Sequence, residues 1–135
     1  MSIEKFYYDN KLPKYFAIAC IFWGVVGMCL GVIAAFQLAF PVLNLSEYFP
    51  HLAFGRLRPV HTNAVIFAFV GNGIFTAVYY AIPRLLETPM WNKTLGSIHF
   101  WGWQFIIVCA AVSLLMGFTT GKEYAELEWP IDILI

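Results

Sequence analysis

Charged residues are scarce in this chain of 135 residues and absent from three long stretches of it. Asp, Glu, Lys and Arg make up 12% of the sequence, against roughly 25% in soluble globular domains. None of them falls within residues 15–40, 60–82 or 94–120. Each stretch exceeds the roughly 20 residues that a helix needs to cross a bilayer. The scarcity excludes an ordinary soluble domain and predicts an all-α membrane protein with three transmembrane helices, over about 15–40, 60–82 and 95–120.

Two further absences narrow the class of protein. Lys and Arg together number 8 and so do Asp and Glu, so the net charge is zero and nothing indicates a nucleic-acid partner. No C-x-x-C motif occurs, and Cys20, Cys29 and Cys109 all fall inside the apolar stretches. This placement predicts small buried hydrophobic side chains rather than metal ligands. No internal repeat or linker marks a second domain, so residues 1–135 form one unit.

The basic residues are divided unevenly between the two ends of the predicted helices. One end, with the N-terminus and the loop between the second and third helices, holds Lys5, Lys11, Lys14, Arg84 and Lys93. The opposite end holds Arg56, Arg58 and Lys122. Because cytoplasmic segments carry the excess of Lys and Arg, we expect the N-terminus on the cytoplasmic side of the membrane.

A histidine stands at the start of the second apolar stretch, in the segment RLRPVHTN over residues 56–63. His61 lies about one residue inside the span, where an ionisable side chain is costly unless it has a use. Neutral imidazole is a good ligand for haem iron. Arg56 and Arg58, one turn outside the histidine, match carboxylates such as haem propionates. A structural hydrogen bond for His61, and anchoring of the arginines at the membrane interface, remain the alternatives.

The remaining polar residues of the spans have less specific interpretations. Residues 61, 65, 68, 72, 76 and 79 fall on one side of a regular helix, which suits either a flat macrocycle or a polar seam between helices. Gly27 and Gly31 form a Gly-x-x-x-Gly pair typical of a generic helix-packing face. His99 lies at the other end of the membrane from His61, so the two cannot bind one iron, and we expect His99 to be structural.

The C-terminal residues combine an acidic segment with the start of a fourth apolar pattern. Glu123, Glu126 and Glu128 are predicted on the same side as the arginine pair, as a solvated loop or as oxygen ligands for a cation such as calcium. Trp129 and Pro130 suit an interface anchor and the first turn of a helix that begins near residue 130. This pattern predicts the N-terminal part of a longer polytopic protein, with a short amphipathic tail as the alternative.

Three motifs in order resemble catalytic subunit I of cbb3-type cytochrome c oxidases, the C-type haem–copper oxidases. They are FGRLRPVHTNAVIFAF at residues 54–69, FWGWQ at 100–104 and KEYAELEWPID at 122–132. The resemblance implies the N-terminal part of a fold with about a dozen transmembrane helices. It also implies a low-spin haem b, a high-spin haem facing copper, partner subunits that carry haem c, and cytochrome c as the electron donor.

The resemblance also implies roles for individual residues. It makes His61 an axial ligand of the low-spin haem b and places Arg58, with Arg56, by the haem propionates. It links Glu123 to a calcium ion, with Glu126 in the same polar cluster. The second axial histidine, the copper ligands and the high-spin haem ligand of the family lie on later helices, so this segment carries no catalytic residue of oxygen reduction.

Three other functions fit parts of the pattern. The large subunit of nitric oxide reductase shares the fold and the haem histidine, although the KEYAELEWP segment favours the oxidase. A stand-alone three-helix assembly or haem-binding protein is the second alternative. A transporter fragment, in which His61 and Asn72 line a polar path, is the third.

Overall fold

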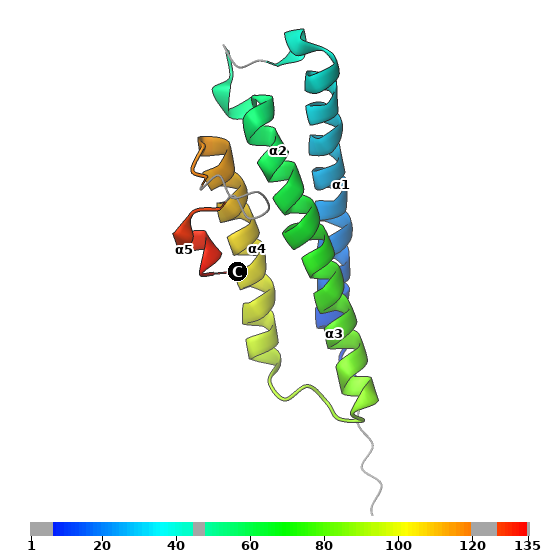
Figure 1. Ribbon diagram of the computed structural model, residues 1–135. Helices are drawn as coiled ribbons and strands as arrows, with labels where there is room; N and C mark the ends of the chain where they lie inside the picture. The colour runs from blue at the N-terminus through cyan, green and yellow to red at the C-terminus, as the bar shows by residue number, and fades with distance from the viewer. Residues whose placement is uncertain (1–6, 45–47, 120–126, 135) are drawn as a thin grey trace, which may run out of the picture.

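The computed structural model describes residues 7–44, 48–119 and 127–134, and in these ranges it has helices joined by turns and loops and no β-strand. Helix α1 spans Lys11–Ala39 and helix α4 spans Lys93–Met116. Between them a single long helix is built from α2 (Phe54–Asn63), the π-helical segment η3 (Ala64–Val70) and α3 (Gly71–Leu85). The 3-10 turns η1 (Pro41–Leu43) and η2 (Pro50–Leu52) follow α1, and a short helix α5 (Trp129–Asp132) packs beside α4 (Figure 1).

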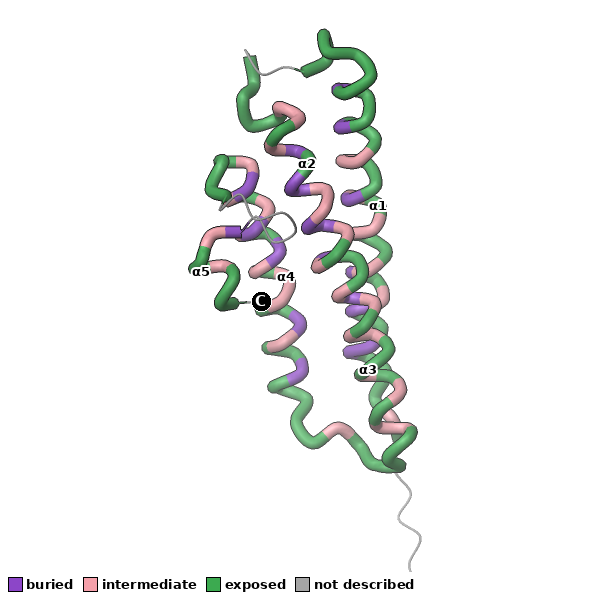
Figure 2. The backbone as a smooth tube through the Cα atoms, in the orientation of Figure 1, coloured by how far each residue is buried: buried purple, intermediate pink, exposed green. Residues whose placement is uncertain are grey.

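Three helical spans are long and apolar enough to cross a membrane, with 29, 32 and 24 residues. The prediction of an all-α protein with three membrane helices is therefore confirmed. Buried residues lie where the helices face one another, whereas the outer faces are exposed (Figure 2). Large apolar side chains such as Phe22, Phe36 and Phe105 occupy those outer faces. Such faces suit contact with lipid or with further apolar helices.

The helix boundaries differ from the sequence prediction at several ends. The second span begins at Phe54 rather than near residue 60, so Arg56 and Arg58 lie within its first two turns. Pro59 lies inside α2, where it lacks the N–H that would donate to the carbonyl four residues earlier. The first span begins at Lys11, where the backbone N–H donates to the Asp9 carboxylate at 3.0 Å.

Helix α4 ends at Met116 rather than near residue 120 because Gly117 adopts a left-handed conformation, with φ of 91°. The N–H of Gly117 donates to the Leu114 carbonyl at 3.0 Å, and that of Phe118 donates to the Ser113 carbonyl at 2.9 Å. This pair of bonds is the Schellman motif, which stops a helix and satisfies its last carbonyls. At the other end the side chain of Asn92 accepts from the N–H of Leu95 and caps the helix.

The π-helical segment η3 corrects the expectation that one strip of side chains runs down the second span. A π-turn holds more residues than an α-turn, so the side chains beyond it are rotated relative to those before it. His61, before the segment, contacts α1, whereas Asn72, after it, bonds to Gln104 of α4. The two residues therefore do not face a common partner.

Two apolar clusters fix the helices against one another. Phe16 of α1 is fully buried against Phe75, Tyr79 and Phe100 from the other two spans. The second cluster joins Val60 of α2 to α4 and to Leu127, close to the start of α5. A helical turn at Trp129–Asp132 agrees with the predicted fourth element near residue 130. The prediction of small buried cysteines is wrong for Cys29, which is exposed, while Cys20 and Cys109 are half-buried.

Candidate functional site

The imidazole of His61 is half-buried between α2 and α1 and has a defined tautomer. Its Nδ1 lies 2.8 Å from the carbonyl oxygen of Gly27. A carbonyl only accepts, so neutral His61 carries its proton on Nδ1 and presents the lone pair of Nε2. Within residues 7–44, 48–119 and 127–134, Nε2 has no hydrogen-bond partner. This is the state in which a histidine binds a metal, with the far nitrogen held by a backbone carbonyl.

Gly31 of α1 makes room for that ring. A Cβ at Gly31 would lie 2.6 Å from Cε1 of His61 and 3.0 Å from its Nε2, closer than real carbon contacts allow. At Gly27 a Cβ would lie 3.3 Å from Val65. The Gly-x-x-x-Gly pair therefore accommodates His61 as well as helix packing, which the spacing alone did not indicate.

The side chain of Arg56 contacts the C-terminal end of α4. Its Nη1 donates to the Leu115 carbonyl at 2.8 Å and lies 3.2 Å from Nδ1 of His51. A Cβ at Gly117 would come within 2.9 Å of the Arg56 guanidinium carbon. Arg56 thus satisfies one of the carbonyls that the Schellman motif leaves over, and the positive charge suits the negative end of the helix. Its remaining guanidinium donors can still reach a carboxylate.

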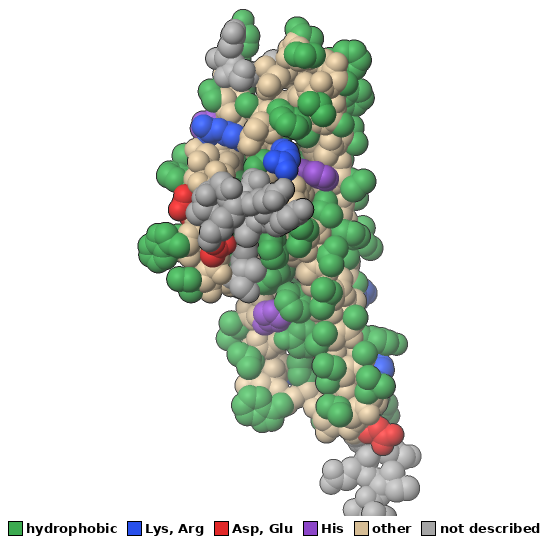
Figure 3. Space-filling view, in the orientation of Figure 1, with side chains coloured by type: hydrophobic (Ala, Val, Ile, Leu, Met, Phe, Trp, Pro, Cys, Tyr) green, Lys and Arg blue, Asp and Glu red, His purple; other side chains and the backbone are tan. Residues whose placement is uncertain are grey.

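Arg58 lies one turn before His61 on the same helix and is exposed. Residues three apart on a helix are neighbours on its surface, so the guanidinium and the imidazole share a face. Figure 3 shows basic and histidine side chains next to one another in the upper part of the molecule. A positive charge beside an open imidazole suits a ligand that joins a metal to carboxylates.

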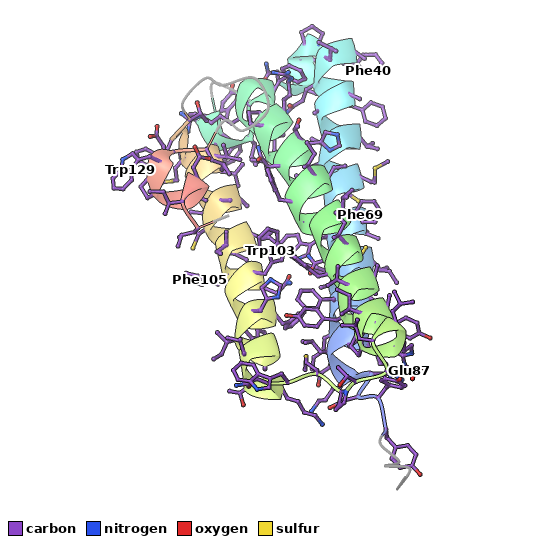
Figure 4. The ribbon with its side chains drawn as sticks, turned by 60° about the horizontal axis from the view of Figure 1, so that its bottom comes forward. Phe40, Phe69, Glu87, Trp103, Phe105 and Trp129 are labelled. Carbon is purple, nitrogen blue, oxygen red and sulfur yellow. The ribbon has the colours of Figure 1, made fainter. Side chains whose placement is uncertain are left out.

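An enclosed cavity between α1, α2 and α4 is too small for a macrocycle. Its volume is about 40 Å³, and its walls are mostly apolar, with Trp23, Asn63, Trp103 and Leu114 among them. That volume suits at most a few water molecules. Trp103 projects from α4 towards the long helix in Figure 4. This cavity therefore has no room for the macrocycle of a haem.

The polar residues beyond the π-helical segment are paired with one another. Trp23 Nε1 donates to Gln104 Oε1 at 2.7 Å, and Gln104 Nε2 donates to Asn72 Oδ1 at 2.9 Å. The Asn72 amide in turn donates to the Ala68 carbonyl. This chain links all three spans at a buried point. It supports the polar-seam alternative for this part of the second span.

His99 lies among aromatic rings. Its Nδ1 is 3.0 Å from the Tyr79 hydroxyl, and its ring centre is 4.5 Å from that of Phe75 and 5.5 Å from that of Phe16. His99 therefore packs against aromatic rings of α1 and α3. The geometry agrees with the structural role expected for His99.

The predicted calcium residues Glu123 and Glu126 lie outside the described residues. Among the side chains that are described, no group of three His, Cys, Asp or Glu is placed to hold a metal ion. A single histidine with a haem macrocycle needs no such group, because the porphyrin supplies four of the iron ligands.

Comparison with known proteins decides the family. Residues 11–135 match the family model described as Cytochrome C and Quinol oxidase polypeptide I. The chain belongs to this family. It is 55% identical over 128 residues to the Cbb3-type cytochrome c oxidase subunit CcoN1 of Stutzerimonas stutzeri, an alignment that covers 95% of this chain. The resemblance inferred from the three motifs is confirmed.

Other relatives give the same result. The chain is 51% identical over 130 residues to cytochrome c oxidase subunit 1 of Rhodobacter capsulatus, with 96% of the chain covered. It is 46% identical over 126 residues to a cytochrome c oxidase subunit 1 homolog of Agrobacterium tumefaciens, with 93% covered. These alignments span 27%, 24% and 23% of the three relatives, so the chain corresponds to about a quarter of their length.

Membership in the oxidase subunit I family implies haem and copper as cofactors and a multi-pass membrane protein. The residues around His61 fit a haem: the donor atom is neutral imidazole nitrogen, its other nitrogen is held by a carbonyl, and a cation lies one turn away. The Gly27 carbonyl and Gly31 were missed as parts of this site. Their spacing is visible in the sequence, but only the packing of α1 on α2 shows that His61 is their partner.

Proposed function

We propose that this chain contributes His61 as one axial ligand of the low-spin haem b in the catalytic subunit of a cbb3-type oxidase. The observation that carries the proposal is the 2.8 Å hydrogen bond from His61 Nδ1 to the Gly27 carbonyl, which leaves Nε2 to bind iron. When bound, the haem iron takes up and releases one electron at a time. His61 holds and orients that group, and its hydrogen bond tunes the basicity of the ligating nitrogen.

The proposed site also includes two arginines and a calcium ion. Arg58 pairs with a haem propionate, and Arg56 offers a weaker contact because it already caps α4. Bidentate pairing with carboxylates is the geometry that guanidinium groups favour. Glu123, with Glu126 in the same cluster, stays our prediction for a calcium ion near the propionates.

The activity of the whole protein follows from the family. We propose that it oxidises cytochrome c, reduces oxygen to water and pumps protons, at a high-spin haem and copper supplied by the remainder of subunit I. Subunits that carry haem c are the proposed partners. The excess of basic residues at Lys5, Lys11, Lys14, Arg84 and Lys93 supports an N-terminus on the cytoplasmic side, and the family supports a bacterial inner membrane as the location.

The test of the haem assignment uses the complete oxidase with His61→Ala. We expect the low-spin haem b signal to disappear from the reduced-minus-oxidised spectrum, because alanine has no nitrogen that can bind iron. His99→Ala is the matched control and keeps the signal. An unchanged spectrum in His61→Ala would contradict the assignment.

The alternatives predict different results. A nitric oxide reductase would consume nitric oxide in place of oxygen, so measuring both gases separates the two enzymes. Membership in the oxidase family removes the basis for the transporter alternative. A stand-alone haem-binding protein would bind haem through His61 without oxygen consumption.

A further inference from the structure

Gly24 and Gly31, both on α1, lie against different aromatic rings of the second span. A Cβ at Gly31 would lie 2.6 Å from Cε1 and 2.9 Å from Nδ1 of His61, so it would strike the imidazole itself. A Cβ at Gly24, two turns earlier, would lie 2.9 Å from the ring of Phe69. Both positions demand glycine because of an aromatic ring on the second span. Only one of those rings can bind a metal.

The position of the His61 ring is set from two directions. The Gly27 carbonyl holds Nδ1 at 2.8 Å, and the bare backbone of Gly31 lies against the same ring, one turn further along α1. The carbonyl fixes the tautomer, and the flat glycine surface fixes the plane of the ring. A methyl group at Gly31 would push the imidazole away and lengthen or break the bond to Gly27.

That hydrogen bond has an electronic consequence. Donation from Nδ1 to a carbonyl raises the basicity of Nε2, and a more basic axial ligand favours the oxidised, more positive iron. Losing the bond would therefore raise the midpoint potential. Turning the ring would also change the spectroscopic signature of a low-spin iron, which depends on the orientation of its axial ligands.

We infer that Gly31 is a positioning residue for the haem-binding histidine, acting through the His61 ring and its bond to the Gly27 carbonyl. This inference rests on the proposed role of His61. Gly27 and Gly31, the helix-packing pair of α1, thus also hold the histidine of the proposed haem site in position.

The test compares Gly31→Ala with Gly24→Ala in the complete oxidase, using redox titration and electron paramagnetic resonance of the low-spin haem. Both changes add one methyl group to α1 against a ring of the second span, so they are matched in size and place. We expect Gly31→Ala to raise the midpoint potential and change the g values, and Gly24→Ala to leave both unchanged. Equal shifts in the two variants would overturn the inference, because they would reflect displacement of α1 alone.

A gentler variant keeps the inference testable if Gly31→Ala does not assemble. A Cβ at Gly27 would lie 3.3 Å from Val65, which is tight but tolerable after a small movement. Gly27→Ala should displace the carbonyl of residue 27 from Nδ1 of His61 and so shift the potential in the same direction, by less. An unshifted potential in Gly27→Ala would then overturn the inference.

The result for His61→Ala separates this inference from the proposed function. If that variant loses the low-spin haem while Gly31→Ala has the parent's potential and g values, the positioning role alone is wrong. If His61→Ala retains the haem, the proposed function is wrong and the positioning role fails with it.

Discussion

The long helix of residues Phe54–Leu85 has two halves whose polar side chains differ in their hydrogen bonding. Before the π-helical segment, His61 bonds through one nitrogen to a backbone carbonyl and leaves the other available. After it, Asn72 is joined to Gln104, and Tyr79 to His99, within a closely packed interior. The surroundings of a histidine, and not its depth in the membrane, thus separate the proposed ligand His61 from the structural His99.

The largest effect expected from this comparison is complete loss and recovery of a haem. His61→Gly should lack the low-spin haem signal, and added imidazole should restore it by occupying the space of the missing side chain. His99→Gly should keep the signal throughout. Reduced-minus-oxidised spectra with and without imidazole provide the measurement, and loss of the signal in His99→Gly would erase the distinction between the two histidines.

A change in the second half of the long helix should alter the stability of the protein and not its haem content. Asn72→Leu leaves the Gln104 amide without its acceptor at a buried point, so we expect it to destabilise the protein by about 1–2 kcal/mol. Thr76→Val is the control, because it removes only the bond from the Thr76 hydroxyl to the Asn72 carbonyl. Unfolding in mixed micelles measures both, while the haem spectrum should stay unchanged. A shifted haem spectrum in Asn72→Leu would contradict the separation of the two halves.

Arg56 and Arg58, both in the first half of the long helix, should differ in the property that changes when each is replaced. Arg56→Ala removes the charged donor from the Leu115 carbonyl and should destabilise the protein by about 1 kcal/mol. Arg58→Ala should alter the potential of the low-spin haem, because its proposed partner is a propionate. Redox titration and unfolding of both variants check this division. The reverse pattern would exchange the two roles.

The smallest effect is expected for the ion pair between Asp9 and Lys93, at the ends of α1 and α4. The N–H of Lys11 and the ammonium of Lys93, the latter at 3.0 Å, lower the pKa of the Asp9 carboxyl. A lowered pKa in the folded protein means that the contribution to stability is present above the unfolded pKa and is lost as the pH falls through the folded value. Since the pair is exposed, Asp9→Asn should destabilise by at most about 1 kcal/mol at pH 7.

Thermal unfolding at neutral and strongly acidic pH tests this prediction. The parent and Asp9→Asn should differ slightly at pH 7 and converge once Asp9 is protonated. A difference that grows with acidity would show that the sign is wrong.

Local sequence features predicted the membrane helices well and their ends less well. Uncharged runs report the hydrophobic thickness of a bilayer, but helices continue into the interface, as α1 and α2 do at Lys11 and Phe54. The end of α4 was missed because the left-handed turn at Gly117 stops the helix inside an apolar run. The irregular segment η3 has no signature in residue spacing, since periodicity assumes a uniform helix.

The amino-acid sequence by itself determined three apolar spans, the side that carries the arginines, and a histidine that resembles a haem ligand of the oxidase family. These properties depend on hydrophobicity and local motifs. Only the tertiary structure decided that Gly27 and Gly31 hold His61, that Arg56 caps α4, and that Asn72 faces another helix. Those contacts join residues far apart in the chain, and the packing of one helix on another, with the rotation introduced at η3, sets which side chains meet.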